Sequence, residues 1–142
     1  MKAITLHQPY ATLIAIGAKR IETRGWRTRY RGSLAIHAAQ AFPLESRALC
    51  SREPFCSALQ RGGYASPDAL PRGAVVATCR LVDCLPTGPD AARPPAGVPP
   101  AGTMEWAFGN YALGRYLWLL EDVVPVRPAR PAKGKQGFWE WE

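Results

Sequence analysis

Segments in which apolar and polar residues alternate recur along this chain, and they constrain its fold more than any other feature. In residues 75–82 the side chains at odd positions (Val, Ala, Cys, Leu) alternate with those at even positions (Val, Thr, Arg, Val). This two-residue period is that of a β-strand with two different faces. Residues 116–124 form the most apolar of these segments. We therefore predict strands at residues 2–7, 21–26, 33–39, 75–82, 116–124 and 138–141.

Helices are predicted in two places between these strands. Pro9 suits the first position of a short helix and Gly17 suits its end. Further helices are expected within residues 41–72, where a loosely helical pattern is interrupted by Pro54. The combination predicts an α+β fold built on a small β-barrel. A chain of 142 residues fits one domain, residues 1–142, with an irregular loop at about residues 86–103 that is rich in Pro, Ala and Gly.

Positive charge is concentrated near the start of the chain. Of the net charge of +7, the first 31 residues carry +6, from seven basic residues against the single acid Glu22. A second basic cluster lies near the end and contains Arg127, Arg130, Lys133 and Lys135. Basic residues gathered in two segments favour an anionic partner, although a solvated charged face would have the same composition.

Other classes of function find little support in the sequence. No apolar run has the length of a membrane span, and the start lacks the apolar region of a signal peptide, so we expect a cytoplasmic protein without a membrane partner. The four cysteines lack zinc-knuckle spacing, and no cluster of potential ligands has the spacing of a metal site. Neither a metal nor a cofactor is therefore predicted.

Several fragments, in order, resemble the ASCH family. The central one is Gly-x-Lys-x-x-Glu-x-Arg, which is Gly17, Lys19, Glu22 and Arg24 in this chain. The others are Gln8-Pro9, Arg31-Gly32, His37-Ala38, the strand after Gly73, and residues 134–139. Each fragment alone is unspecific, but their order and spacing together are fairly specific.

The resemblance implies a PUA-like pseudobarrel with a cleft beside the first helix, and a role related to nucleic acids. Members of the family resemble RNA or DNA binders, amidohydrolases acting on N4-acetylcytidine, or ribonucleases. Fold alone does not choose between these activities. The leading hypothesis is a module that binds single-stranded or modified RNA, or a nucleotide, in a basic cleft. A third hypothesis makes the Pro-rich loop a docking element for another protein.

The expected ligand site lies around the first helix and the strand after it. Tyr10 and Trp26 could stack on a base, and Gln8 could hydrogen-bond to a base edge. Glu22 and Arg24 share one face of the predicted strand. The alternative to ligand binding is core packing for Tyr10 and a structural salt bridge between Lys19 and Glu22. The candidate binding residues are Gln8, Pro9, Tyr10, Lys19, Glu22, Arg24, Trp26, Arg29, Arg31 and His37.

A catalytic role would rest on Lys19 and Glu22. In the resembling amidohydrolases a lysine stands at the position of Lys19 and a threonine nucleophile at that of Glu22. Thr23 follows directly but should point to the opposite face of the strand. The remaining catalytic hypothesis makes Glu22 a general base, with Lys19 stabilising an oxyanion and Glu105 as a possible second carboxylate.

Overall fold

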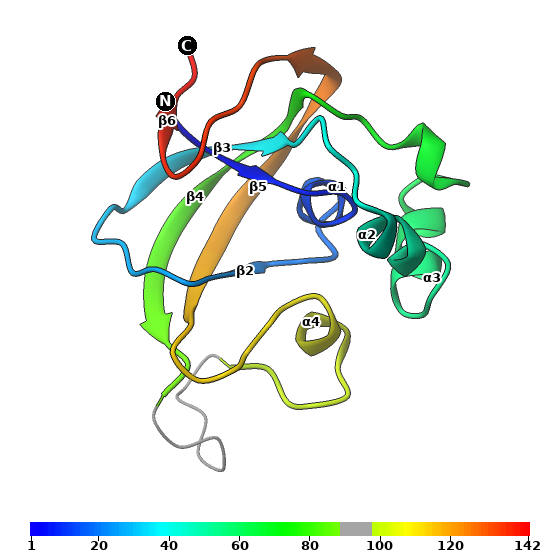
Figure 1. The fold of residues 1–142 in the computed structure, drawn as a ribbon. Coiled ribbons are helices and arrows are strands. Elements are labelled where there is room, and N and C mark those ends of the chain that lie inside the picture. The colour runs from blue at the N-terminus through cyan, green and yellow to red at the C-terminus, as the bar shows by residue number, and fades with distance from the viewer. Residues whose placement is uncertain (89–97) are drawn as a thin grey trace.

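A six-stranded mixed sheet forms the framework of the computed structural model, which describes residues 1–88 and 98–142 (Figure 1). The strand order across the sheet is β2-β5-β4-β3-β1-β6. β1 runs parallel to β3, and every other neighbouring pair in this order is antiparallel. The strands are β1 (Lys2–Leu6), β2 (Ile21–Arg24), β3 (Gly32–Ala38), β4 (Ala74–Pro86), β5 (Tyr116–Pro131) and β6 (Trp139–Glu140).

All six predicted strands are present, but β4 and β5 extend beyond the predicted segments. These two long strands pair from Ala74↔Pro131 to Pro86↔Tyr116, with three irregularities in the register. Such irregularities bend a strand and redirect its side chains, and they also hide the two-residue alternation from the sequence. The predicted irregular loop begins after β4; its residues 89–97 lie outside the described part of the chain.

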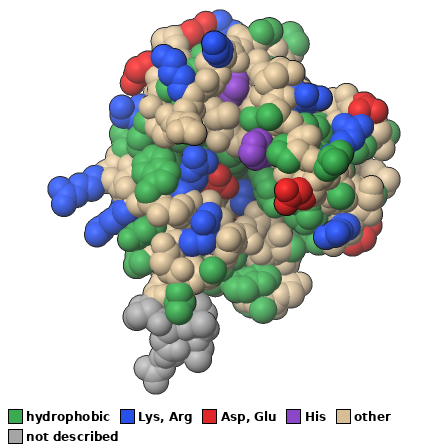
Figure 2. Space-filling view, viewed as in Figure 1, with side chains coloured by type: hydrophobic (Ala, Val, Ile, Leu, Met, Phe, Trp, Pro, Cys, Tyr) green, Lys and Arg blue, Asp and Glu red, His purple; other side chains and the backbone are tan. Residues whose placement is uncertain are grey.

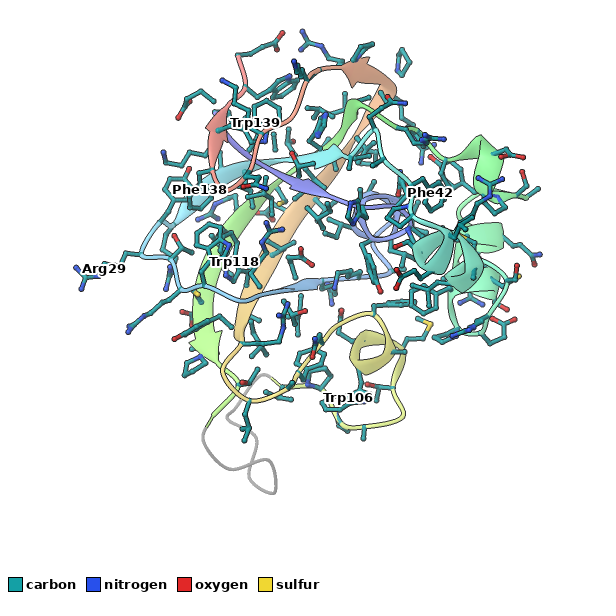
Figure 3. The ribbon with its side chains drawn as sticks, in the orientation of Figure 1. Arg29, Phe42, Trp106, Trp118, Phe138 and Trp139 are labelled. Atoms are coloured by element: carbon teal, nitrogen blue, oxygen red, sulfur yellow. The ribbon has the colours of Figure 1, made fainter. Side chains whose placement is uncertain are left out.

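The sheet is not closed into the small barrel that the sequence predicted. In the described part of the chain, β2 and β6 are the two edges and do not pair with each other. Aromatic side chains fill the space between these edges instead. Trp26, just after β2, packs edge-on against Phe138, just before β6, with ring centroids 5.3 Å apart. Both rings also contact Trp118 of β5, which lies near Phe138 in Figure 3. Side-chain packing therefore takes the place of a closing ladder of hydrogen bonds.

Short helices complete the α+β fold. Helix α1 (Tyr10–Ala15) buries Ala11 and Ile14 against the sheet. Leu13 of the same helix joins a second cluster with Phe55 and Phe108. The remaining helices are α2 (Leu44–Leu49), α3 (Phe55–Arg61), the 3-10 turn η1 (Pro67–Ala69) and α4 (Met104–Ala107). Among the described residues, no helix is long and apolar enough to cross a membrane.

Candidate functional site

Two adjoining hollows lie where β1, β2 and the end of β5 approach one another. The smaller, here called the inner pocket, has a volume of about 410 Å³ and is lined by residues that include Tyr10, Glu22, Arg24, Asn110 and Arg115. The larger, here called the outer cleft, measures about 1220 Å³ and is lined by His7, Arg24, Trp26, His37 and residues 131–137, among others. Thr5, His7 and Arg24 line both. Figure 2 shows basic, acidic and histidine side chains gathered on this face.

Lys19 does not line either hollow. Its side chain is fully buried, and its Nζ donates to the carbonyl oxygens of Ile21 and Phe108, each at 2.6 Å. The Glu22 carboxylate lies 3.6 Å from the same ammonium. Burial lowers the pKa of Lys19, and the negative charges of Glu22 and Glu105 act in the opposite direction. Lys19 is therefore an internal cation that ties the end of α1 to the segment after α4 and lies behind the wall of the pocket.

Glu22 connects this internal cation to the surface of the pocket. One carboxylate oxygen faces Lys19, and the other accepts a hydrogen bond from Nη1 of Arg24 at 3.2 Å. Glu22 remains slightly exposed, at 8%, and it lines the inner pocket. Arg24 lies at the junction of pocket and cleft, with its guanidinium 5.9 Å from the ring centroid of Trp26, within the range of a cation–π contact. Of the three charged residues in the motif, Glu22 and Arg24 thus reach the hollows, and Lys19 supports them from behind.

The candidate residues at the start of α1 are likewise of two kinds, buried supports and residues that line the pocket. The Gln8 side chain is buried, with its Oε1 accepting from the Thr12 N–H and its Nε2 donating to the Thr12 hydroxyl and the Pro71 carbonyl. It therefore stabilises the start of the helix and has no donor left for a base edge. Pro9 is buried beside it. Tyr10 does line the inner pocket, although its ring also packs edge-on against Phe55 at 6.0 Å.

Of the candidate binding residues that follow β2, one lines the outer cleft and two lie outside both hollows. Trp26 lines the outer cleft and packs against Trp118, with ring centroids 4.7 Å apart. Arg29 is exposed and points away from the body of the molecule (Figure 3). Arg31 binds Asp83 and the backbone carbonyls of its own turn. Neither arginine lines the pocket or the cleft, so the structure does not gather the basic turn into the site.

His37 lines the outer cleft and belongs to an ordered chain of hydrogen bonds. Trp139 Nε1–H donates to Thr5 Oγ1 at 3.0 Å, and an indole can only donate. The Thr5 hydroxyl is 3.1 Å from His37 Nδ1, and His37 Nε2 is 2.7 Å from the Ala132 carbonyl, which can only accept. This arrangement places the proton of a neutral imidazole on Nε2 and leaves Nδ1 as the acceptor for Thr5. Burial lowers the pKa of His37, in agreement with a neutral ring.

We predict that His37 makes the fold less stable as the solution is acidified below about pH 6.5, the ordinary pKa of histidine. The pKa of His37 is lower in the folded chain, so the unfolded chain binds more protons between the two pKa values. The free energy of unfolding therefore decreases as the pH is lowered. His37→Gln keeps a donor for Ala132 but cannot titrate. Urea unfolding of both proteins from about pH 7.5 to about pH 5.5 should show a steeper loss for the wild type.

The comparison with His37→Gln is necessary because Glu105 acts in the opposite direction. Burial raises the pKa of Glu105, so this group adds stability as the pH falls towards its ordinary value. Glu105 is present in both proteins, so its contribution cancels when their free energies of unfolding are subtracted. Equal pH profiles for the two proteins would show that His37 does not titrate differently on unfolding.

Glu105 does not supply a second carboxylate to the pocket. Its oxygens accept from the backbone N–H groups of Arg20, at 2.7 Å, and Ile21, at 3.4 Å, and thereby fix the start of β2. Thr23 was predicted to point to the opposite face of the strand from Glu22, yet it lies at the inner pocket. It is among the lining residues, and its hydroxyl accepts from the Asn110 N–H at 2.9 Å. The Thr23 hydroxyl thus serves to hold the segment after α4 against β2.

Sequence reasoning missed part of the lining. Asn110 and Arg115 come from the segment between α4 and β5, and no pattern in the sequence assigned that segment to the first helix. Residues 131–137 form much of one wall of the outer cleft. Their signal was available, because residues 134–139 are one of the fragments that resemble the ASCH family, and Lys133 and Lys135 belong to the second basic cluster.

The assembled site combines three chemical features in one concavity. Glu22 offers an acceptor at the inner pocket, Arg24 offers guanidinium donors at the junction, and Trp26 offers an aromatic surface at the cleft. The inner pocket lies within the range of about 300–1,000 Å³ that is typical of small-molecule sites. The arrangement can hold a planar polar group and a neighbouring anion at the same time.

Comparisons with known proteins agree with the motif in the sequence. Residues 4–98 match the ASCH domain family, which covers more than half of the chain. Activating signal cointegrator 1 from Homo sapiens is 32% identical over 82 residues, and its counterpart from Mus musculus has the same identity over the same length. These matches cover 58% of this chain but only 14% of each relative, so the likeness concerns one part of those proteins.

Proposed function

This chain belongs to the ASCH domain family, and we propose that it binds a nucleotide or single-stranded nucleic acid, with RNA as the preferred class, in the inner pocket and outer cleft. The observation that supports this proposal best is the position of Arg24. Its guanidinium lines both hollows, is oriented by Glu22 and lies 5.9 Å from the centroid of Trp26. A cation beside an aromatic ring that is partly exposed, as Trp26 is, can hold a phosphate next to a stacked base.

A hydrolytic function finds less support in the geometry. The hypothesis requires Lys19 to stabilise an oxyanion and Glu22 to activate water. The Lys19 ammonium is instead saturated by two carbonyl oxygens and Glu22, and it lies behind the pocket wall. A binding function needs only groups that already line the hollows. The docking hypothesis concerns the Pro-rich loop at about residues 86–103, of which residues 89–97 lie outside the described part of the chain.

We predict that Arg24→Gln weakens binding of single-stranded RNA by about tenfold or more, because a hydrogen bond to a charged group contributes about 1.5–3 kcal/mol. The probe is a fluorescein-labelled single-stranded RNA of mixed sequence, followed by fluorescence anisotropy at about 50 mM and about 200 mM salt. Arg52→Gln is the matched control, since Arg52 is exposed and lines neither hollow.

Two results would count against this function. No binding by the wild type at the lower salt concentration would remove the proposal altogether. Equal losses for Arg24→Gln and Arg52→Gln would show that the RNA responds to overall charge and not to the site. An unlabelled duplex of the same sequence, added as competitor, checks the preference for single strands.

A further inference from the structure

Residues 131–137 form much of one wall of the outer cleft, yet they lie beyond residues 4–98, the segment that matches the ASCH domain family. In the chain they run from the end of β5 towards β6. In space they line the outer cleft together with Arg24 and Trp26. This C-terminal wall therefore adds groups to the site from beyond the matched segment, although residues 134–139 are one of the fragments that resemble the family.

The wall is fixed to the sheet by specific contacts. The Ala132 carbonyl accepts from His37, and the Ala132 N–H donates to the Gly73 carbonyl at 3.0 Å. Gly134 lies directly on Thr5 and His37, where a Cβ atom would come within 2.5 Å of the Thr5 hydroxyl. Only glycine permits such a close approach of backbone to side chain. Residues on either side of Gly134 are thereby held in place at the cleft.

The side chains on either side of Gly134 are Lys133 and Lys135. Both are exposed, both line the outer cleft, and neither has an ion-pair partner among the described residues. Arg24, which also lines the cleft, is paired with Glu22. The two lysines are thus the uncompensated positive charges that this wall presents to the cleft.

Charge also divides the two hollows. The inner pocket carries the Glu22 carboxylate, which would repel a phosphate group, and the guanidinium of Arg115 there already donates to backbone carbonyl oxygens. The outer cleft carries Arg24, Lys133 and Lys135 and no acidic lining residue among those described. An anion entering the site is therefore favoured in the outer cleft, whereas the inner pocket suits an uncharged group that donates hydrogen bonds.

We propose that Lys133 and Lys135 bind backbone phosphates of a single-stranded nucleic acid whose base occupies the inner pocket. This assignment rests on the proposed function and adds the C-terminal wall as the phosphate-binding side of the site. Two phosphates are expected to be neutralised, one by each ammonium. Because each phosphate contact on a single strand contributes about 0.7 to the slope of log affinity against log salt concentration, the pair should contribute about 1.4.

The test compares two double variants with the same change in charge. Lys133→Ala/Lys135→Ala removes the lysines of the wall, and Arg29→Ala/Arg52→Ala removes two exposed arginines that line neither hollow. All four side chains are exposed, and thermal unfolding checks that each variant folds. Affinity for the labelled single-stranded RNA is measured from about 50 mM to about 200 mM salt. We expect the salt slope to fall by about 1.4 for the lysine variant and to stay at the wild-type value for the arginine variant.

Each other outcome overturns a different statement. If the wild type does not bind the RNA, the proposed function fails, and this inference fails with it. If the wild type binds but the lysine variant keeps the wild-type slope, the wall does not hold phosphates, while the proposed function stands. If the salt slope decreases by the same amount in both variants, the lysines contribute only to the overall charge, and the phosphate assignment is overturned.

Discussion

Replacing Lys19 by methionine should lower the free energy of unfolding by about 3–5 kcal/mol, the usual cost of removing one member of a buried ion pair. Methionine is similar in length but has no donor. The carbonyl oxygens of Ile21 and Phe108 would lose their partner at 2.6 Å, and each unsatisfied buried acceptor costs about 1–3 kcal/mol. Glu22 would also lose its internal cation. Urea unfolding followed by far-ultraviolet circular dichroism measures the loss.

Lys2→Met is the matched control for this prediction. Lys2 pairs with Glu140 at the surface, and exposed pairs contribute about 0–1 kcal/mol. A Lys19→Met protein as stable as the Lys2→Met protein would show that the ammonium is not an internal support. The prediction also affects how binding experiments are interpreted. Weaker RNA binding by a Lys19 variant would report the loss of the fold around the pocket and not a missing contact to the ligand.

The burial of Lys19 illustrates where sequence reasoning ends. The motif places Lys19, Glu22 and Arg24 within six residues, which correctly suggests that they interact. The partner that closes the arrangement is the Phe108 carbonyl, 89 residues further along the chain. A backbone carbonyl has no residue-type signal, and α4, which precedes it, has only four residues. Whether a motif lysine faces solvent or the interior therefore depends on a contact that the sequence pattern does not encode.

The strands were easier to predict than their arrangement. Alternation marks a half-buried strand locally, and each of the six predicted segments contains one. Closure into a barrel depends on pairing between strands distant in sequence, here β2 and β6. The sequence predicts Trp26 as a candidate binding residue whose ring stacks on a base. It does line the cleft, but the same ring also contacts Trp118 and Phe138 between the open edges, a second use that local alternation cannot reveal.

The aromatic cluster between the two edges leads to the second large effect. Trp118 is completely buried on β5, its ring contacts Trp26 and Phe138, and its Nε1 donates to the Trp26 carbonyl at 3.4 Å. Trp118→Ala should lower the free energy of unfolding by about 3–5 kcal/mol, because removing a large buried ring leaves a cavity that the surrounding sheet can only partly fill. Because the Arg24 guanidinium lies 5.9 Å from the Trp118 ring centroid, binding of RNA should weaken as well.

Trp106→Ala is the matched control, since Trp106 is only half-buried and stacks on Tyr111 at a centroid distance of 4.9 Å, outside the cluster formed by Trp26, Trp118 and Phe138. Its loss should cost clearly less stability and should leave RNA binding unchanged. If Trp118→Ala does not fold, it is replaced by Trp118→Phe, which keeps an aromatic ring but removes the indole donor, and the control becomes Trp106→Phe. Trp118→Phe should then be the less stable of the two. Equal stabilities for the Trp118 and Trp106 variants would contradict the argument, because side-chain packing would then not be what holds β2 and β6 together across the open sheet.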